Sequence, residues 1–190
     1  MQTGKTVTCG VVLRVTDTKE TDRILTVLTA DRGKIPLIAR GARRKNSRLA
    51  ASCQLPAYSE LTLYKRGSWY MLDEASPLEL FDALGRDIVL LSLASWFCEL
   101  TEAVCAEETP APEMLSLLLN ALYALCYLDK DPALVKTAFQ WRLMALAGFQ
   151  PFVDGCAVGG GLCPLRAGGR GRPHAGRAGR ACDLRRLQEP

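Results

Sequence analysis

The densest group of chemically capable side chains lies in the stretch ARGARRKNSR at residues 39–48. Five of its ten residues are cationic, namely Arg40, Arg43, Arg44, Lys45 and Arg48. Guanidinium and ammonium groups bind phosphate and carboxylate oxygens, so such a cluster can hold a polyanion. The same composition is also typical of a solvated surface loop, and the choice between the two depends on the neighbouring elements.

The other chemically capable residues do not form a catalytic site. Gly4-Lys5-Thr6 is similar to the end of a phosphate-binding loop but lacks the upstream glycine and strand that such a loop requires. His174 is the only histidine and lies in a Gly/Arg-rich segment, where a nucleophile–histidine pair has no scaffold. Glu107 and Glu108 are explained by solvation at a helix end. We therefore expect a protein that is not an enzyme.

The cysteines raise the question of a zinc site near the C-terminus. A structural zinc site draws on two close cysteine pairs, but Gly159 occupies the position where the close partner of Cys156 is expected. Cys163 and Cys182 follow at spacings unlike a zinc ribbon, so we expect unpaired thiols and no cofactor. The remaining cysteines are scattered through apolar segments, which favours reduced, buried thiols and a cytoplasmic location over a disulfide framework.

The first part of the chain, residues 1–75, predicts a small β-barrel. Short runs with alternating or β-branched residues occur at 8–15, 24–29, 34–39, 60–64 and 69–75. Turn residues at 31–33 predict that the second and third runs pair as a hairpin, and turn residues at 65–68 predict the same for the last two runs. Closure removes exposed strand edges, so an OB-like barrel is the preferred fold and an SH3-like barrel the alternative.

The second part, residues 76–154, predicts an α-helical bundle. Ser76-Pro77-Leu78-Glu79 has the pattern of a helix-capping box, and apolar residues follow at helical spacing. The run 113–128 is apolar nearly all round, which predicts a central helix. A further helix is expected over 133–147, ending at Gly148, with one face marked by Leu134, Ala138, Trp141 and Ala145. The predicted class is therefore α+β, a barrel followed by helices.

The last part, residues 155–190, is rich in Gly, Arg, Ala and Pro, and we expect it to be a disordered tail. Charge also divides the chain, because residues 1–66 hold 13 Lys/Arg against 5 Asp/Glu, whereas residues 67–154 hold 4 against 13. This asymmetry favours two modules with different partners. Neither a signal-like apolar segment nor a run of about 18 apolar residues occurs, which argues against secretion and against a membrane partner.

The neighbouring elements favour a binding function for the basic stretch at residues 39–48. It follows a predicted strand directly, and Gly41 lets the backbone turn, so its cations project from one barrel loop. Charge clustered beside a small barrel is typical of contact with nucleic-acid phosphates. Aromatic residues for base stacking are few, so electrostatics should dominate. The predicted DNA-binding residues are Lys34, Arg40, Arg43, Arg44, Lys45, Arg48, Lys65 and Arg66.

Several motifs occur together at a characteristic spacing. Gly33-Lys34 leads through an apolar strand into A-R-G-A-R, Ser47-Arg48 follows, and Leu55-Pro56 precedes the next strand. With AGFQPFVDGC at 147–156, these residues resemble the RecO family of bacterial recombination mediators over roughly residues 5–155. The resemblance implies an OB-fold barrel, a helical domain and, in many members, a four-cysteine zinc element.

The resemblance also implies a non-enzymatic function in DNA repair. Members of the family bind and anneal single- and double-stranded DNA, and together with RecR they help load the RecA recombinase. They also bind the acidic C-terminal tail of the single-strand DNA-binding protein. Carried over to matching positions, the family's DNA contacts fall on the loop 40–48. Only Cys156 matches its zinc pattern, with Cys163 a possible remnant, and an altered reading frame is one explanation of the unusual tail.

An alternative from another class stays open. A protein-interaction scaffold would use the same basic loop to bind an acidic segment of a partner and would never contact nucleic acid. Titration with single-stranded DNA at two salt concentrations separates the two hypotheses, because only the first predicts salt-dependent DNA binding.

Overall fold

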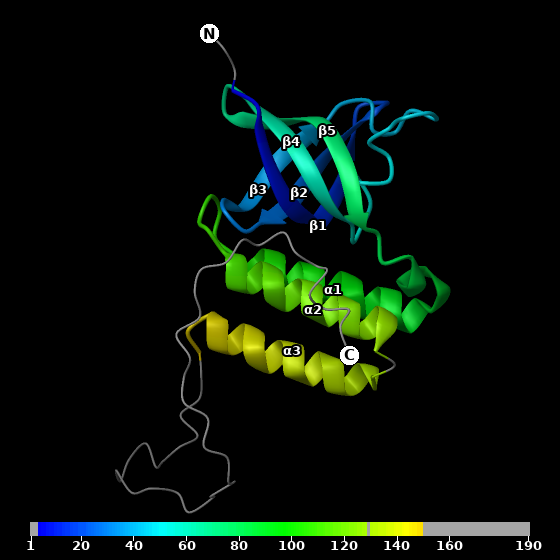
Figure 1. Cartoon of the computed structure of the whole chain (residues 1–190), viewed down its shortest axis with the longest axis vertical. Coiled ribbons are helices and arrows are strands. Elements are labelled where there is room, and N and C mark those ends of the chain that lie inside the picture. The colour runs from blue at the N-terminus through cyan, green and yellow to red at the C-terminus, as the bar shows by residue number, and fades with distance from the viewer. Residues whose placement is uncertain (1–3, 129, 150–190) are drawn as a thin grey trace, which may run out of the picture.

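The computed structural model describes residues 4–128 and 130–149, which form a five-stranded barrel followed by helices (Figure 1). The strands are β1 (Thr6–Thr18), β2 (Asp22–Thr29), β3 (Gly33–Ala39), β4 (Tyr58–Arg66) and β5 (Trp69–Glu79). They close in the order β1-β2-β3-β5-β4, with β3 parallel to β5 and the other pairs antiparallel. This topology confirms the predicted OB-like barrel, including its two hairpins.

Alternating burial along the strands builds the barrel interior. In β3 every second residue is buried, from Gly33 to Ala39, as the period of two requires. Gly10 of β1 permits the close approach of β2, because a Cβ atom there would lie 2.6 Å from Cγ1 of Val27. The interior is filled by Val12, Leu25, Val27, Ile35, Leu37, Leu61, Leu63 and Leu72, among others.

The predicted helix start at Ser76–Glu79 is wrong, because these residues form the end of β5. Ser76 pairs with Glu60 and Pro77 with Ser59, and a register shift beside Ser59 accommodates the proline. Cross-strand pairing thus overrides the local capping pattern. A 3₁₀ turn, η1 (Asp82–Arg86), follows, and Asp87 caps the first helix by accepting a hydrogen bond from the amide of Val89 at 2.7 Å.

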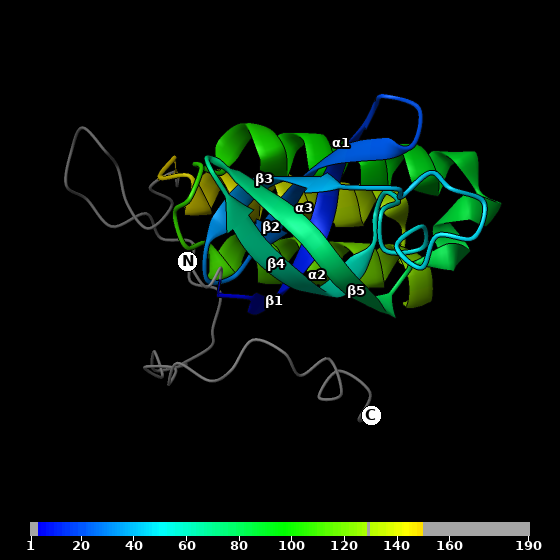
Figure 2. The same ribbon diagram turned by 90° about the horizontal axis from the view of Figure 1, so that it is seen from above.

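The three helices are α1 (Ile88–Val104), α2 (Pro112–Tyr127) and α3 (Pro132–Leu146). They lie together on one side of the barrel (Figures 1 and 2). A second apolar core joins barrel and helices, and the ring of Phe97 from α1 stacks on that of Phe139 from α3 at 4.1 Å between centroids. Within the described residues, no helix is long and apolar enough to cross a membrane.

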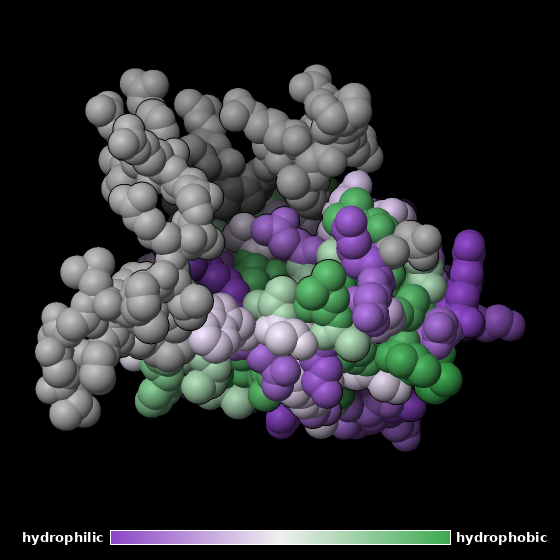
Figure 3. Space-filling model, turned by 90° about the horizontal axis from the view of Figure 1, so that it is seen from below, coloured by the Kyte–Doolittle hydropathy of each residue, from purple (hydrophilic) through white to green (hydrophobic). Residues whose placement is uncertain are grey.

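Helix α3 buries a different face from the one that the sequence marks. Val135, Phe139 and Leu143 are buried, whereas Leu134 and Trp141 are 61% and 57% exposed. Figure 3, which views the molecule from the helical end, shows apolar side chains interspersed with polar ones on this surface. The predicted disorder of residues 155–190 lies outside the described residues.

Candidate nucleic-acid interface

The structure divides the eight predicted DNA-binding residues among three places. Five of them lie on the segment that leaves β3, residues 40–48, which we call the basic loop. Lys65 and Arg66 lie at the end of β4, in the hairpin that joins β4 to β5, at the other end of the barrel from the basic loop (Figures 1 and 2). Lys34 lies at the start of β3, beside the helices. The three places have different surroundings, so each is described separately.

The basic loop is fixed at its base to the hairpin that joins β1 and β2. Gly41 has a φ of 66°, and its amide donates a hydrogen bond to a carboxylate oxygen of Asp22 at 2.8 Å. The amide of Arg43 donates to the carbonyl of Thr21 at 3.0 Å. The bond from Gly41 lowers the pKa of the Asp22 carboxyl below its ordinary value of 3.8. Backbone bonds therefore position the loop, while the side chains of Arg40, Arg44, Lys45 and Arg48 are exposed.

Most of the loop's cations form no ion pair with the described residues. Arg43 pairs with Asp17 of β1 at 3.4 Å between Nε and Oδ2, and Asp17 also pairs with Arg23 at 3.0 Å. Among the described residues, no ion pair involves the other four loop cations, all of them exposed: Arg40, Arg44, Lys45 and Arg48. None of these ion pairs joins the basic loop to the acidic helices, so the loop keeps a free positive face.

Lys34 belongs to a joint between the barrel and the helices. Its ammonium group donates to the carbonyl oxygen of Glu102 at 2.9 Å, near the C-terminal end of α1, where a positive charge is favourable. Its own carbonyl accepts a bond from the amide of Glu108 at 3.1 Å. Arg14 of β1 pairs with the Glu102 carboxylate at 3.0 Å. The structure therefore does not bring Lys34 together with the basic loop.

Lys65 and Arg66 belong to a second cationic region, which contains aromatic rings. We call it the hairpin rim and define it as Arg32, Lys65, Arg66, Trp69 and Tyr70. Two cations contact the Tyr70 ring, with the Arg32 guanidinium carbon at 5.6 Å and the Lys65 nitrogen at 5.4 Å from its centroid.

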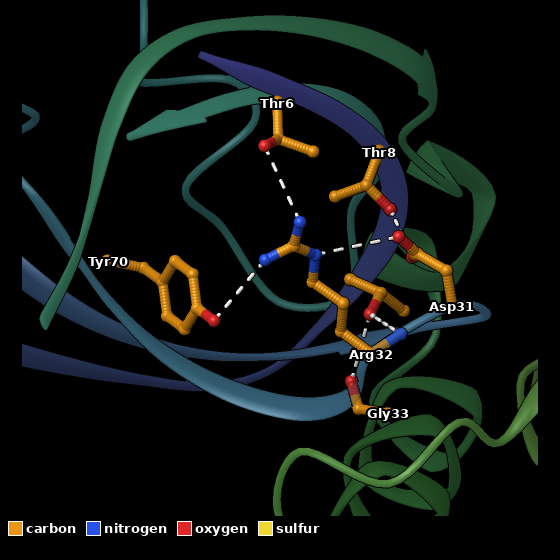
Figure 4. A network of polar contacts seen from close by, with 7 residues as sticks. Thr6, Thr8, Asp31, Arg32, Gly33 and Tyr70 are labelled. Carbon is orange, nitrogen blue, oxygen red and sulfur yellow. Dashed lines mark hydrogen bonds and ion pairs between the residues drawn. The ribbon is translucent and has the colours of Figure 1, made fainter. Parts of the chain in front are cut away.

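Arg32 reaches across one end of the barrel toward two strands (Figure 4). It donates to the Tyr70 hydroxyl at 3.3 Å and to the Thr6 hydroxyl at 3.4 Å, and it pairs with Asp31 at 3.6 Å. Asp31 in turn accepts a bond from Thr8 at 2.6 Å. Arg32 was not predicted as a site residue, because residues 31–33 indicate only a turn in the sequence. Its side chain meets Tyr70, 38 residues away, only in the closed barrel.

The described residues contain no candidate metal site, and two of their cysteines are fully buried. No group of three possible metal-ligating side chains occurs among them. Cys53 and Cys98 are fully buried, and burial raises the pKa values of their thiols to about 11 and about 12. These thiols therefore act as small apolar groups, as predicted. Cys156 and Cys163, the possible zinc remnants, lie outside the part that the structure describes.

Comparison with known proteins assigns the barrel and the helices to one family. The model of the N-terminal part of recombination protein O matches residues 1–81, and that of the C-terminal part of the same protein matches residues 85–182. The chain belongs to the RecO family. The division between the two matches falls near the end of β5, where the barrel passes into the helices.

Curated relatives support this membership. The DNA repair protein RecO of Acetivibrio thermocellus is 36% identical over 149 residues, which cover 78% of this chain and 59% of that protein. That of Symbiobacterium thermophilum is 32% identical over 160 residues, covering 84% and 63% of the two chains. The chain therefore spans about 60% of the length of these RecO proteins.

Proposed function

We propose that this RecO-family chain is a non-enzymatic DNA-repair mediator that binds single- and double-stranded DNA through the basic loop. The observation that carries the proposal is the free charge of this loop. Four exposed cations without ion pairs in the described part of the chain project from a loop held by backbone bonds. Each can neutralise a phosphate without first breaking an internal contact.

The mechanism follows from electrostatics, with no bond made or broken. Phosphates carry the charge in every sequence, so the loop binds DNA without reading bases. Two strands on one positive surface repel each other less, which lets complementary bases pair and accounts for strand annealing. The family resemblance extends the proposal to RecR, to loading of RecA and to the acidic tail of the single-strand DNA-binding protein. The helical part is the proposed surface for protein partners.

One observation favours the alternative of a protein-interaction scaffold. Asp17 already places a carboxylate against Arg43 of the basic loop, which shows that the loop geometry accepts a carboxylate. An acidic peptide from a partner would bind the remaining cations in the same way. The two proposals differ in whether DNA binds at all at moderate ionic strength.

The test replaces three unpaired loop cations, Arg44, Lys45 and Arg48, with alanine. The matched control removes three exposed cations of the helical half, Arg86, Lys130 and Arg142, and so changes the net charge equally. We expect the loop variant to bind a single strand and a duplex at least tenfold more weakly. The slope of log K against log salt for the duplex should fall by about 3, since each phosphate contact contributes about 0.9.

The control variant should leave both the affinity and the slope close to those of the unmodified chain. An unchanged slope in the loop variant would contradict the proposed interface. If the unmodified chain binds neither form of DNA but binds a glutamate-rich peptide, and the loop variant loses that binding, the scaffold alternative is correct.

A further inference from the structure

The hairpin rim offers an exposed aromatic ring beside one exposed cation, Arg66. Trp69 is the first residue of β5, directly after the turn at Gly67 and Ser68, and it is 42% exposed. Within residues 4–128 and 130–149, its ring makes no stacking or cation–π contact and its indole nitrogen no hydrogen bond. An indole that serves the fold normally finds such partners, so this ring is available to a ligand.

Two cations lie on the neighbouring strand, one on each face of the hairpin. Arg66 pairs directly with Trp69 across the hairpin, and such cross-strand partners project from the same face of the sheet. Lys65 pairs with Tyr70 and lies over that ring. Both cations are exposed, and neither forms an ion pair among the described residues. The face of the sheet that carries Trp69 therefore combines an exposed ring with the charge of Arg66, whereas Lys65 lies on the opposite face, over the ring of Tyr70.

We propose that the hairpin rim is a second nucleic-acid contact, in which Trp69 stacks on an unpaired base while Arg66, on the same face of the hairpin, holds a flanking phosphate. This inference rests on the proposed DNA-binding function and gives it a strand preference. In a duplex the faces of the bases are stacked on one another, so only a single strand presents a face to the indole. Every base has such a face, so the contact selects single strands without selecting a sequence.

The strand pairing connects the rim with the basic loop. The parallel pairs Leu37–Tyr70 and Ala39–Leu72 place Trp69 level with residue 36, four residues before Arg40. At about 3.3 Å per residue, the start of the loop lies roughly 13 Å along the sheet from Trp69, a distance that a few nucleotides span. Asp73, which by the same register is level with Arg40, pairs with Lys5 at 2.6 Å. A single strand can therefore contact both regions.

The experiment measures binding of an oligothymidylate and of a duplex of equal length by anisotropy. Replacing Trp69 with alanine should weaken oligothymidylate binding about 5- to 150-fold, since stacking on one base contributes about 1–3 kcal/mol. Duplex binding should change less than about twofold. Trp69→Phe keeps an aromatic face and should retain most of the affinity. Trp141→Ala is the matched control, because Trp141 is 57% exposed on α3, outside both cationic regions.

Fluorescence supplies a readout that does not depend on affinity. A base stacked on Trp69 quenches its emission, so saturation with oligothymidylate should quench the unmodified chain and Trp141→Phe but not Trp69→Phe. Because Trp69→Phe retains the packing volume of a large ring, it keeps the test valid even if the alanine variant unfolds.

The outcomes separate this inference from the proposed function. If oligothymidylate quenches Trp69→Phe as it does the unmodified chain, and Trp69→Ala binds it normally, the stacking contact is wrong. In that case weaker binding by the basic-loop variant would still support the proposed interface. Equal losses for single strand and duplex in Trp69→Ala would also overturn the strand preference. Failure of the unmodified chain to bind either DNA would overturn both proposals.

Discussion

The basic loop and the hairpin rim are both cationic, but they are built in different ways. The loop has no aromatic residue, and its anchor consists of backbone bonds to Asp22 and Thr21. The rim is assembled from side chains, with both Arg32 and Lys65 in cation–π contact with Tyr70. Equal charge therefore supports different ligands: a loop of free cations binds any phosphate backbone, whereas cations beside an exposed indole favour unstacked bases.

The two regions also differ in how they connect to the helices. The turn that carries Arg32 continues into Gly33 and Lys34, and both contact the segment between α1 and α2. The basic loop makes its backbone contacts only within the barrel, to Thr21 and Asp22. A change at the joint should therefore disturb the rim far more than the loop.

The largest expected effect comes from Gly33→Ala. Gly33 has a φ of 64°, and an added Cβ atom would overlap the carbonyl oxygen of Thr109. We expect the free energy of unfolding to fall by about 3 kcal/mol or more, because the backbone of the joint must move. Oligothymidylate binding should weaken with it. Chemical denaturation monitored by tryptophan fluorescence measures the loss of stability.

Gly41→Ala is the matched control in the basic loop. Gly41 has a similar φ of 66°, but the nearest atoms to its added Cβ belong to the flexible side chain of Arg44, at 3.3 Å and beyond. The cost should be that of the left-handed backbone alone, about 1 kcal/mol. Equal losses in the two variants would mean that the joint does not constrain the rim.

The barrel and the basic loop were predictable from the sequence because both depend on local patterns. Residues 34–39 alternate as a strand does, and the cations of 40–48 are adjacent in the chain. The end of β5 was not predictable in this way. Ser76 and Pro77 have the local signature of a helix start, and only the distant strand β4 shows that they are paired.

The position of each cation in the fold could not be predicted from the sequence either. Lys34, Lys65 and the loop cations have the same chemistry, but Lys34 bonds to a carbonyl 68 residues away and Lys65 lies near the end of β4, in the hairpin with β5. Nothing local distinguishes a lysine that docks a helix from one that meets solvent. Only the closed barrel shows that the predicted residues divide among the basic loop, the hairpin rim and the joint between barrel and helices.

A smaller effect is expected from removing single carboxylates that neutralise each region. Asp17→Asn frees Arg43 of the basic loop, and Asp73→Asn frees Lys5 beside the rim. Because a surface ion pair contributes up to about 1 kcal/mol, freeing Arg43 should strengthen duplex binding by up to about fivefold. Freeing Lys5 should strengthen only oligothymidylate binding.

The two asparagine variants control for each other, since each removes one negative charge. Anisotropy titrations with both forms of DNA give four affinities, and the comparison predicts a gain on the duplex for Asp17→Asn alone. Equal gains for both variants on both ligands would show that net charge matters and that position does not.

The smallest expected effect is a difference in pH dependence between the two regions. The amide of Gly41 lowers the pKa of Asp22 below 3.8, so this anchor stabilises the loop above that pH and weakens as the pH falls through the lowered value. The hydrogen bond to Asp73 raises the pKa of Lys5 above 10.5. Its contribution is therefore complete below that pH and is lost as the pH rises through the raised value.

Acid should thus loosen the basic loop, and alkali the face beside the rim. In NMR titrations, the Gly41 amide signal should shift with a midpoint below 3.8, and Asp22→Asn should abolish that shift. The side-chain carbon signals of Lys5 should titrate above 10.5, and Asp73→Asn should return the midpoint toward that value. If the Gly41 signal titrates equally in Asp22→Asn, the carboxylate does not anchor the loop, and the backbone bond from Arg43 to Thr21 must position the cations alone.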